Sequence, residues 1–263
     1  MTAVLLGIVA AFCFGAMTVA VRAALRQVPD AAAGAFVTSA VGLVVAVLVD
    51  LVVSVGPDDL TSAEIWPFVL AGLIAPGVAG LFFVLAVELA GAARAAVLIT
   101  AAPLIATVPA FLLLGEPFHL ALAGGAVLIV AGGVVLNRER LEQAGFRRLG
   151  LVLGLAAAAL IAVRDNVARW AARHYPVSGL AAGAAALAGA AALLAVYLVA
   201  TRRAEAVTTV RRAFGPFLAG GILLGAAYSA LLEALTRGRV TVVTPLYATE
   251  SFWTIMLAAD PKP

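Results

Sequence analysis

The amino-acid sequence predicts an all-α polytopic membrane protein. Of its 263 residues, 64% are apolar and only 12% are charged, whereas soluble domains carry about 25% charged residues. The apolar residues gather in runs of about twenty, which is enough for a helix to cross a bilayer core of about 30 Å. Prolines such as Pro76, Pro103 and Pro109 lie inside these runs, where neighbouring helices can satisfy the carbonyl groups that proline leaves free.

Five helices are predicted in the first half of the chain. The first run has no positive charge before it, so we interpret it as a membrane span rather than as a secretory signal. Pro76 and Gly77 predict a kink in the third helix. The fourth and fifth helices form a hairpin around the short hinge 115–119. The predicted ranges are 1–26, 31–55, 65–89 and two helices within 94–136.

Four more helices are predicted in the second half. The most polar segment of the chain, 138–148, contains four arginines and two glutamates and is predicted to be a linker between the halves. An arginine-rich loop is expected at 201–213. The predicted helices are 149–174, 177–200, 214–235 and 240–259. The sequence thus predicts about nine transmembrane helices.

A family resemblance follows from the residues of the hairpin. Pro103-Leu104, Leu-Leu-Leu-Gly-Glu-Pro at 112–117 and Leu-Ile-Val-Ala-Gly-Gly at 128–133 resemble the closing half of an EamA repeat of the drug/metabolite transporter superfamily. The resemblance implies a metabolite carrier built from two inverted five-helix repeats, with residues 1–137 as the first repeat and 149–263 as the second.

Internal similarity also indicates a duplication. Glu88 and Arg94 have the same separation as Glu233 and Arg239, at an offset of 145 residues. Two further matches pair Ala20-Val21-Arg22 with Ala162-Val163-Arg164 and Pro67-Phe68 with Pro216-Phe217. The chain ends in Asp-Pro-Lys-Pro where the second repeat would continue into a tenth helix. We therefore expect the tenth helix to be missing, and favour a C-terminal truncation over a nine-helix variant.

Arginine counts predict how the chain lies across the membrane. The segments around 22–30, 90–94, 137–148 and 201–213 share one side, and this side is predicted to be cytoplasmic, with the N-terminus external. The family resemblance implies the opposite, an internal N-terminus. We favour the arginine count, which rests on Arg22, Arg26, Arg94, Arg138, Arg140, Arg147, Arg148, Arg202, Arg203, Arg211 and Arg212 against Arg164, Arg169, Arg173, Arg237 and Arg239.

Glu250 is the first candidate for a functional site. It lies at the middle of the predicted span 240–259, between Tyr247 and Trp253 at one-turn spacing. A charge at that depth costs about 3 kcal/mol on insertion scales, so the group is protonated, paired or facing water. The functional interpretation is a carboxylate that couples protons or contacts substrate. The alternative is a neutral acid hydrogen-bonded within the bundle, and the aromatic residues could equally be packing residues.

Arg164, Asp165 and Asn166 form the second candidate site, well inside the predicted helix 149–174. Adjacent residues point about 100° apart on a helix, so we do not expect Arg164 and Asp165 to reach the same spot. We expect Arg164 to extend toward the membrane interface.

The remaining polar candidates have structural interpretations. Gly115, Glu116 and Pro117 match the hinge of the family, and Glu116 is expected to bind free amides at the start of the following helix. Two helix-end ion pairs are expected, Glu88 with Arg94 and Glu233 with Arg239.

The sequence favours a transporter that exports or exchanges a small metabolite or drug-like solute by alternating access. A lipid flippase, a membrane scaffold and, less favoured, a membrane-embedded enzyme stay open as alternatives, although no cluster of catalytic groups is visible. The expected partners are a small-molecule substrate, protons and the lipid bilayer, and a homo-oligomer is compatible with the sequence. Cys13, His119 and His174 are too dispersed to suggest a metal site, and no cofactor or nucleic acid is expected. The expected location is the plasma or inner membrane.

Overall fold

The structure is a computed structural model, and it describes most of the chain. The described residues are 1–53, 62–90, 95, 98–117, 120, 124–125, 127–128, 131–132, 135, 148–202 and 205–258. Within them the chain forms helices joined by short turns, with no strand.

The first three predicted spans are present, and the third is kinked as predicted. The first two are α1 (Thr2–Gln27) and α2 (Ala31–Val53). The third consists of four short pieces, because Ala75, immediately before Pro76, has an extended backbone with φ −148° and ψ 128°. These pieces are η1 (Ala63–Ile65), α4 (Trp66–Gly72), η2 (Leu73–Val78) and α5 (Ala79–Ala90).

Helix α7 (Ala102–Leu114) is the longest described part of the predicted fourth helix. A turn at Thr100 and Ala101 precedes it. Its end is set by Gly115, whose φ of +62° lies in the left-handed region that glycine adopts readily. The predicted fifth helix and the linker 138–147 lie largely outside the described residues.

The second half contains α9 (Arg148–His174), α10 (Gly179–Arg202) and α11 (Ala206–Arg237). The expected loop 201–213 is wrong, because α11 begins at Ala206 rather than at 214. Residues 206–214 contain alanine, valine, threonine and arginine but no glycine or proline, so nothing in them stops a helix.

The predicted helix 240–259 is two helices, α12 (Val240–Tyr247) and α13 (Glu250–Ala258). A turn at Ala248 and Thr249 separates them. The Thr249 hydroxyl donates to the carbonyl oxygen of Leu246 at 2.6 Å, which offers this carbonyl a partner other than a helical amide. The Asp-Pro-Lys-Pro end, 260–263, lies outside the described residues.

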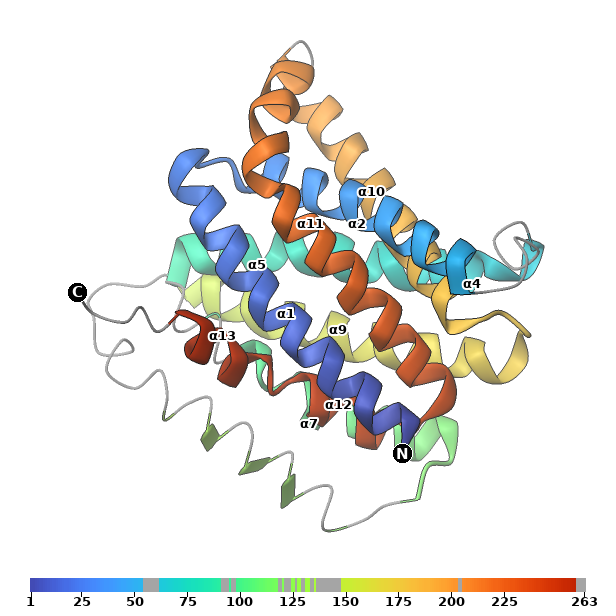
Figure 1. Ribbon diagram of the computed structural model, residues 1–263. Coiled ribbons are helices and arrows are strands. Elements are labelled where there is room, and N and C mark those ends of the chain that lie inside the picture. The colour runs from blue at the N-terminus through green and yellow to red at the C-terminus, as the bar shows by residue number, and fades with distance from the viewer. Residues whose placement is uncertain are drawn as a thin grey trace.

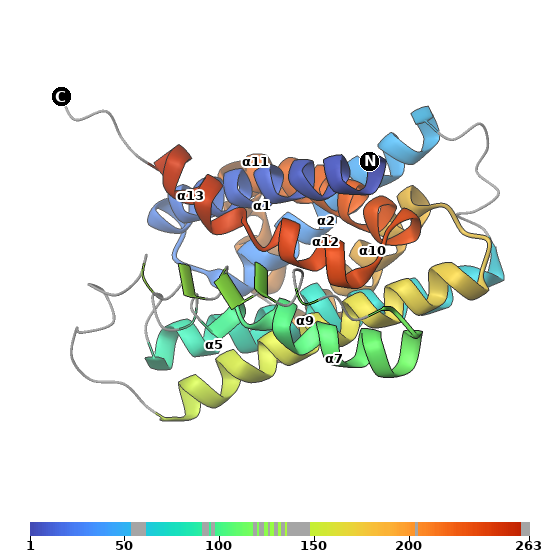
Figure 2. The ribbon, with the colours of Figure 1, turned by 90° about the horizontal axis from the view of Figure 1, so that it is seen from below.

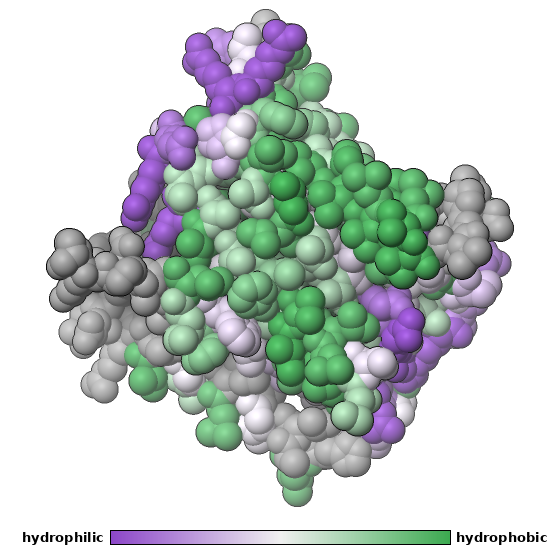
Figure 3. All heavy atoms as spheres, viewed as in Figure 1, coloured by the Kyte–Doolittle hydropathy of each residue, from purple (hydrophilic) through white to green (hydrophobic). Residues whose placement is uncertain are grey.

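Six helical segments of the described chain are long and apolar enough to cross a membrane. They are Thr2–Gln27, Ala31–Val53, Ala63–Ala86, Arg148–His174, Gly179–Arg202 and Ala206–Arg237. Apolar side chains cover most of the face formed by α1 and α11, and hydrophilic residues gather toward its rim (Figure 3).

The helices pack mainly against helices from the other half of the chain. Helix α11 lies along both α1 and α2, while α9 packs on α5 and α7, and α10 packs on α2 and α4 (Figure 1). Figure 2 shows two layers, with α1, α11 and α13 in one and α5, α7 and α9 in the other. Small residues allow close helix crossings, as at Gly42 against Gly225 and Gly72 against Ala186.

Candidate functional site

Arg164 and Asp165 form a buried ion pair well inside α9. Arg164 Nε lies 2.8 Å from Asp165 Oδ1, and the two side chains are 4% and 0% exposed. The contact is an ion pair rather than a well-aligned hydrogen bond, since neither atom has a hydrogen-bond partner among the described residues. Pairing lowers the large cost of burying each charge alone.

Hydroxyl groups from two other helices complete the Arg164 cluster, which consists of Arg164, Asp165, Tyr228, Thr244 and Tyr247. Tyr247 Oη donates to Asp165 Oδ2 at 2.6 Å, and Thr244 Oγ1 donates to the same oxygen at 3.2 Å. Arg164 donates from Nη1 to Tyr228 Oη at 2.9 Å and from Nη2 to Tyr247 Oη at 3.5 Å. The cluster therefore joins α9, α11 and α12.

The expectation that Arg164 extends to the interface is wrong. The Arg164 residue is only 3% exposed, and its guanidinium carbon lies 5.5 Å from the ring centre of Tyr228 and 5.9 Å from that of Tyr247. The long arginine side chain nevertheless reaches its neighbour Asp165, with Nε 2.8 Å from Oδ1, so the 100° separation does not keep the two apart. The rings and hydroxyl groups hold it in the interior.

Glu250 begins α13 one turn after Tyr247. Its side chain is partly exposed, and its carboxylate interacts electrostatically with Arg164, Tyr228 and Tyr247. Among the described residues, this carboxylate has no hydrogen-bond or ion-pair partner. Glu250 thus lies at the break between α12 and α13 and is available to take up a proton or to bind a cation.

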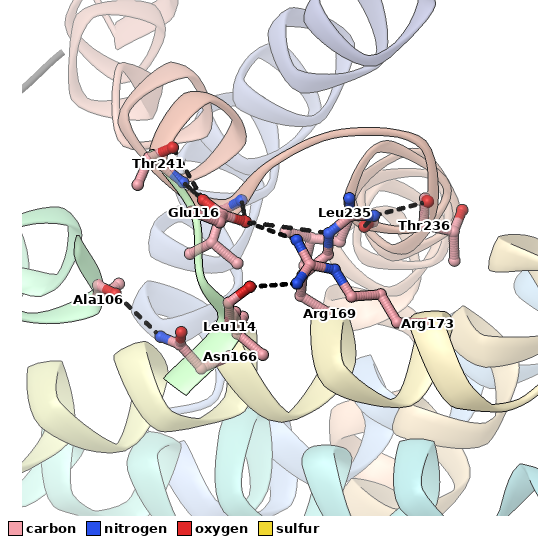
Figure 4. Close-up of polar contacts among 10 residues, drawn as sticks. Ala106, Leu114, Glu116, Asn166, Arg169, Arg173, Leu235, Thr236 and Thr241 are labelled. Carbon is pink, nitrogen blue, oxygen red and sulfur yellow. Dashed lines mark hydrogen bonds and ion pairs between the residues drawn. The ribbon is translucent and has the colours of Figure 1, made fainter. Parts of the chain in front are cut away.

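Two candidate residues lie away from this cluster. Trp253 packs edge-to-face on Phe12, with ring centres 5.5 Å apart, and its Cβ lies against Gly15 of α1. Asn166 donates from Nδ2 to the carbonyl oxygen of Ala106 in α7 at 3.0 Å (Figure 4). Both residues hold helices together.

Glu116 binds free amides as expected, but at a different helix. Its Oε1 accepts from the amide of Val240 at 2.9 Å, and its Oε2 accepts from the amide and the hydroxyl of Thr241 at 3.0 and 2.8 Å. Glu116 is 1% exposed. It therefore caps the N-terminus of α12, which lies beside it in space, and not the helix that follows it in the sequence.

Two arginines of α9 surround this carboxylate (Figure 4). Arg169 Nε and Arg173 Nη2 lie 3.9 and 4.0 Å from Glu116 Oε1. Arg169 also donates to the carbonyl oxygens of Leu235 and Thr236 at the end of α11, at 2.9 and 2.8 Å. Arg173 donates to the carbonyl oxygen of Leu114 at the end of α7. We call Glu116, Arg169, Arg173 and Thr241 the Glu116 cluster, and it joins α7, α9, α11 and α12.

The expected ion pair between Glu233 and Arg239 is wrong. Glu233 pairs with Arg237, one helical turn away in α11, because the helix continues to Arg237 and keeps the two side chains on one face. The side chain of Glu88 and the whole of Arg94 lie outside the described residues, so their expected pair stays a prediction.

Sequence analysis missed Tyr228, Thr244, Arg169 and Arg173. Thr244 precedes Tyr247 by three residues, and this helical spacing could have identified it as a neighbour on the same face. Tyr228 is a polar group inside an apolar span, which is itself a signal. Arg169 and Arg173 were counted only as orientation charges.

Comparisons with known proteins agree with this architecture. Residues 1–138, which are more than half of the 263-residue chain, match the EamA-like transporter family. Thirteen chains of solved structures match, and one described as "Crystal structure of protein" has a TM-score of 0.78 and 23% identity, covering 100% of this chain and 92% of that chain. At this identity the likeness shows the fold alone. No curated protein matches the chain. By its matching residues, this multi-pass membrane protein belongs to the EamA-like transporter family.

Proposed function

We propose that the protein moves a small metabolite or drug-like solute across the plasma or inner membrane by alternating access. One observation carries the proposal in this family of transporters: the Arg164 cluster and Glu250 lie together where the last described helical stretch is broken into α12 and α13. Broken helices with polar groups at mid-membrane are typical of substrate and ion sites in transporters.

The proposal gives the residues of this region different roles. Arg164 is engaged by Asp165, Tyr228 and Tyr247, so it is a fixed part of the site. Glu250 is the group that exchanges a proton or contacts the solute, because its carboxylate has no hydrogen-bond or ion-pair partner among the described residues. Trp253 and Asn166 support the helices around the site.

Alternating access would use two inverted repeats, residues 1–137 and 149–263, joined by the linker 138–148. Reciprocal contacts support this division. Gly42 packs against Gly225, and Gly77 packs against Ala190. Adding 148 to 42 gives 190, and adding 148 to 77 gives 225, so exchanging the halves turns one contact into the other.

A second pair of contacts behaves in the same way. Thr38 lies near Gly220, and Gly72 lies against Ala186. Adding 148 to 38 gives 186, and adding 148 to 72 gives 220. These contacts favour an offset of 148 over the offset of 142 that pairs Arg22 with Arg164 in the sequence match. With an offset of 148, Arg164 corresponds to Ala16, so the Arg164 cluster belongs to the second half alone.

The directions of α2 and α10 support an inverted relation. Asp30, just before α2, pairs with Arg202 at the end of α10. Ser178, just before α10, donates to Asp50 near the end of α2 at 3.3 Å. These corresponding helices therefore run antiparallel, as expected for repeats related by an axis in the membrane plane.

Reconstitution into liposomes tests the proposed function. The purified full chain would be offered a panel of amino acids, nucleobases and cationic dyes, and uptake would be compared with that of empty liposomes and of a Glu250→Gln variant. Uptake of at least one solute above the level of empty liposomes, changed by Glu250→Gln, supports a carrier. Lipid scrambling without solute uptake would instead indicate a flippase, and no activity of either kind would favour a scaffold.

A further inference from the structure

The Glu116 cluster lies on the same side of the molecule as the N-terminus. Helix α12 begins with Val240 and Thr241, two residues after Gly238, and Gly238 lies against Ala3 at the start of α1. Glu116 lies two residues after Leu114, the last residue of α7. The carboxylate therefore connects the end of one span to the start of another at one face of the bundle.

We propose that Glu116 is a releasable latch, which keeps the Arg164 cluster closed from the N-terminal side while α7 and α12 stay together. The proposal rests on the proposed function, because alternating access gives the release of a closed side its purpose. Glu116 acts here as a positioning residue, through α12.

The hydrogen bonds of Glu116 require both oxygen atoms of its carboxylate, so replacing one oxygen by nitrogen should weaken the latch. Both carboxylate oxygens accept, one from the Val240 amide and the other from the amide and hydroxyl of Thr241. A glutamine at position 116 would place an amide NH₂ donor against one of these donors. One set of contacts is then lost whichever way the glutamine is oriented.

The positive charges around Glu116 also make the position of α12 depend on the charge of this carboxylate. Arg169 interacts electrostatically with Arg173 and Arg239 as well as with Glu116. Glu116 is the negative charge among these three positive groups, and it holds Arg169 and Arg173 close to α12. Without its charge, the arginines repel each other at the junction of α7, α9 and α11, and α12 loses its anchor.

Release of α12 would reach the candidate transport site directly. Thr244 lies one turn after Thr241 and is fully buried. Thr244 and Tyr247 both donate to Asp165 from α12. Glu116 therefore contacts the start of α12, and Asp165 contacts its later residues. When Glu116 releases α12, the movement of this short helix opens the path to Asp165.

Cysteine accessibility tests the latch without requiring a known solute. The full chain would carry Cys13→Ser and Thr244→Cys, and a membrane-impermeant maleimide would be applied to the N-terminal side in oriented proteoliposomes. We expect Glu116→Gln to raise the labelling rate about tenfold, because loss of a buried charge-assisted contact shifts a two-state equilibrium by at least this factor. The matched control is Glu233→Gln, which removes the ion pair with the half-exposed Arg237 at the end of α11 on the same side and should leave the rate unchanged.

An unchanged labelling rate in folded Glu116→Gln protein would overturn the proposal and make Glu116 a permanent cap. If Glu116→Gln does not fold, the same labelling measurement is made on Thr241→Val. This variant removes the hydroxyl contact to Glu116 and keeps the shape of the side chain. That variant should raise the rate severalfold, and no rise would also overturn the latch. A raised rate in a chain that carries no solute would leave the latch standing and contradict the proposed function.

Discussion

Tyr247 donates a hydrogen bond of 2.6 Å to Asp165, and through it the end of α12 is bound to the middle of α9. The same carboxylate accepts from Thr244 and faces Arg164. Asp165 thus compensates the one arginine of the described chain that lies deep within a span and links it to the helix that begins at the Glu116 cluster.

Asp165→Asn should strongly destabilise the protein. It leaves Arg164 buried without its counter-charge, and breaking a buried pair from one side costs about 3–5 kcal/mol. Thermal unfolding in detergent, followed by tryptophan fluorescence, measures the effect. Asp30→Asn is the matched control, because its partner Arg202 is 40% exposed and such pairs contribute at most about 1 kcal/mol. Equal losses for the two variants would contradict the assignment.

The two tyrosines of the Arg164 cluster should differ when each is changed to phenylalanine. Tyr247→Phe removes a donor to Asp165 and an acceptor of Arg164, whereas Tyr228→Phe removes only an acceptor of Arg164. We expect Tyr247→Phe to lower the unfolding free energy by about 1–3 kcal/mol and Tyr228→Phe by less. Denaturant unfolding of both variants checks the order, and the reverse order would contradict the geometry.

Sequence reasoning identified polar residues of the Arg164 cluster and Glu250, but not the contacts that these residues make. Arg164, Asp165 and Glu250 were found because charges inside apolar spans are rare and expensive. Their contacts with Tyr228 and Thr244 depend on how α11 and α12 lie against α9, which helical periodicity within one segment does not contain. The break at Ala248 and Thr249 was missed because neither residue is a glycine or a proline, the residues that mark most helix ends in a sequence.

Glu250→Gln should abolish the dependence of transport on a pH gradient while leaving insertion and expression intact. Gln keeps the size and polarity of the side chain but cannot exchange a proton. The measurement is solute uptake into liposomes with and without an imposed gradient, and the control is Glu64→Gln in the exposed first turn of η1. Unchanged gradient dependence, or a variant that does not accumulate, would make Glu250 a structural acid.

Gly72→Ala should be among the most damaging substitutions of small residues. A Cβ at position 72 would lie 1.8 Å from the backbone oxygen of Ala186, which cannot move aside as a side chain can. Gly80→Ala is the control, because a Cβ there meets nothing within 4 Å, and alanine favours a helix by about 1 kcal/mol over glycine. Size-exclusion chromatography in detergent, which separates folded from aggregated protein, should show loss of Gly72→Ala alone.

Reporter fusions test the membrane orientation. The arginine count predicts that a reporter fused after Arg148 is cytoplasmic and one fused after Asp59 is external. Under this orientation the Glu116 cluster faces outward. The structure removes three arginines from the smaller group of the count. Arg164, Arg169 and Arg173 bind partners in the interior or at helix ends, so they are poor orientation signals. Opposite reporter signals would favour the internal N-terminus that the family resemblance implies.

The fold as a class was more predictable than the individual contacts. Length, hydropathy and the Pro76-Gly77 kink identified most of the spans, since crossing a bilayer demands long apolar helices. Glu116 was correctly assigned a capping role but to the wrong helix. Its partners Val240 and Thr241 are far away in the sequence, and only the packed bundle brings them to the carboxylate.

The close packing of α1 and α2 on α11 affects how the protein is made. These two neighbouring helices contact each other little, and both pack on α11, which begins at Ala206. A ribosome therefore completes α1 and α2 long before their common partner leaves the exit tunnel. Until then Gly42, which packs closely on α11 in the finished bundle, faces lipid or the insertion machinery. Assembly of the bundle is thus a late event, which follows insertion of the second half instead of accompanying the first.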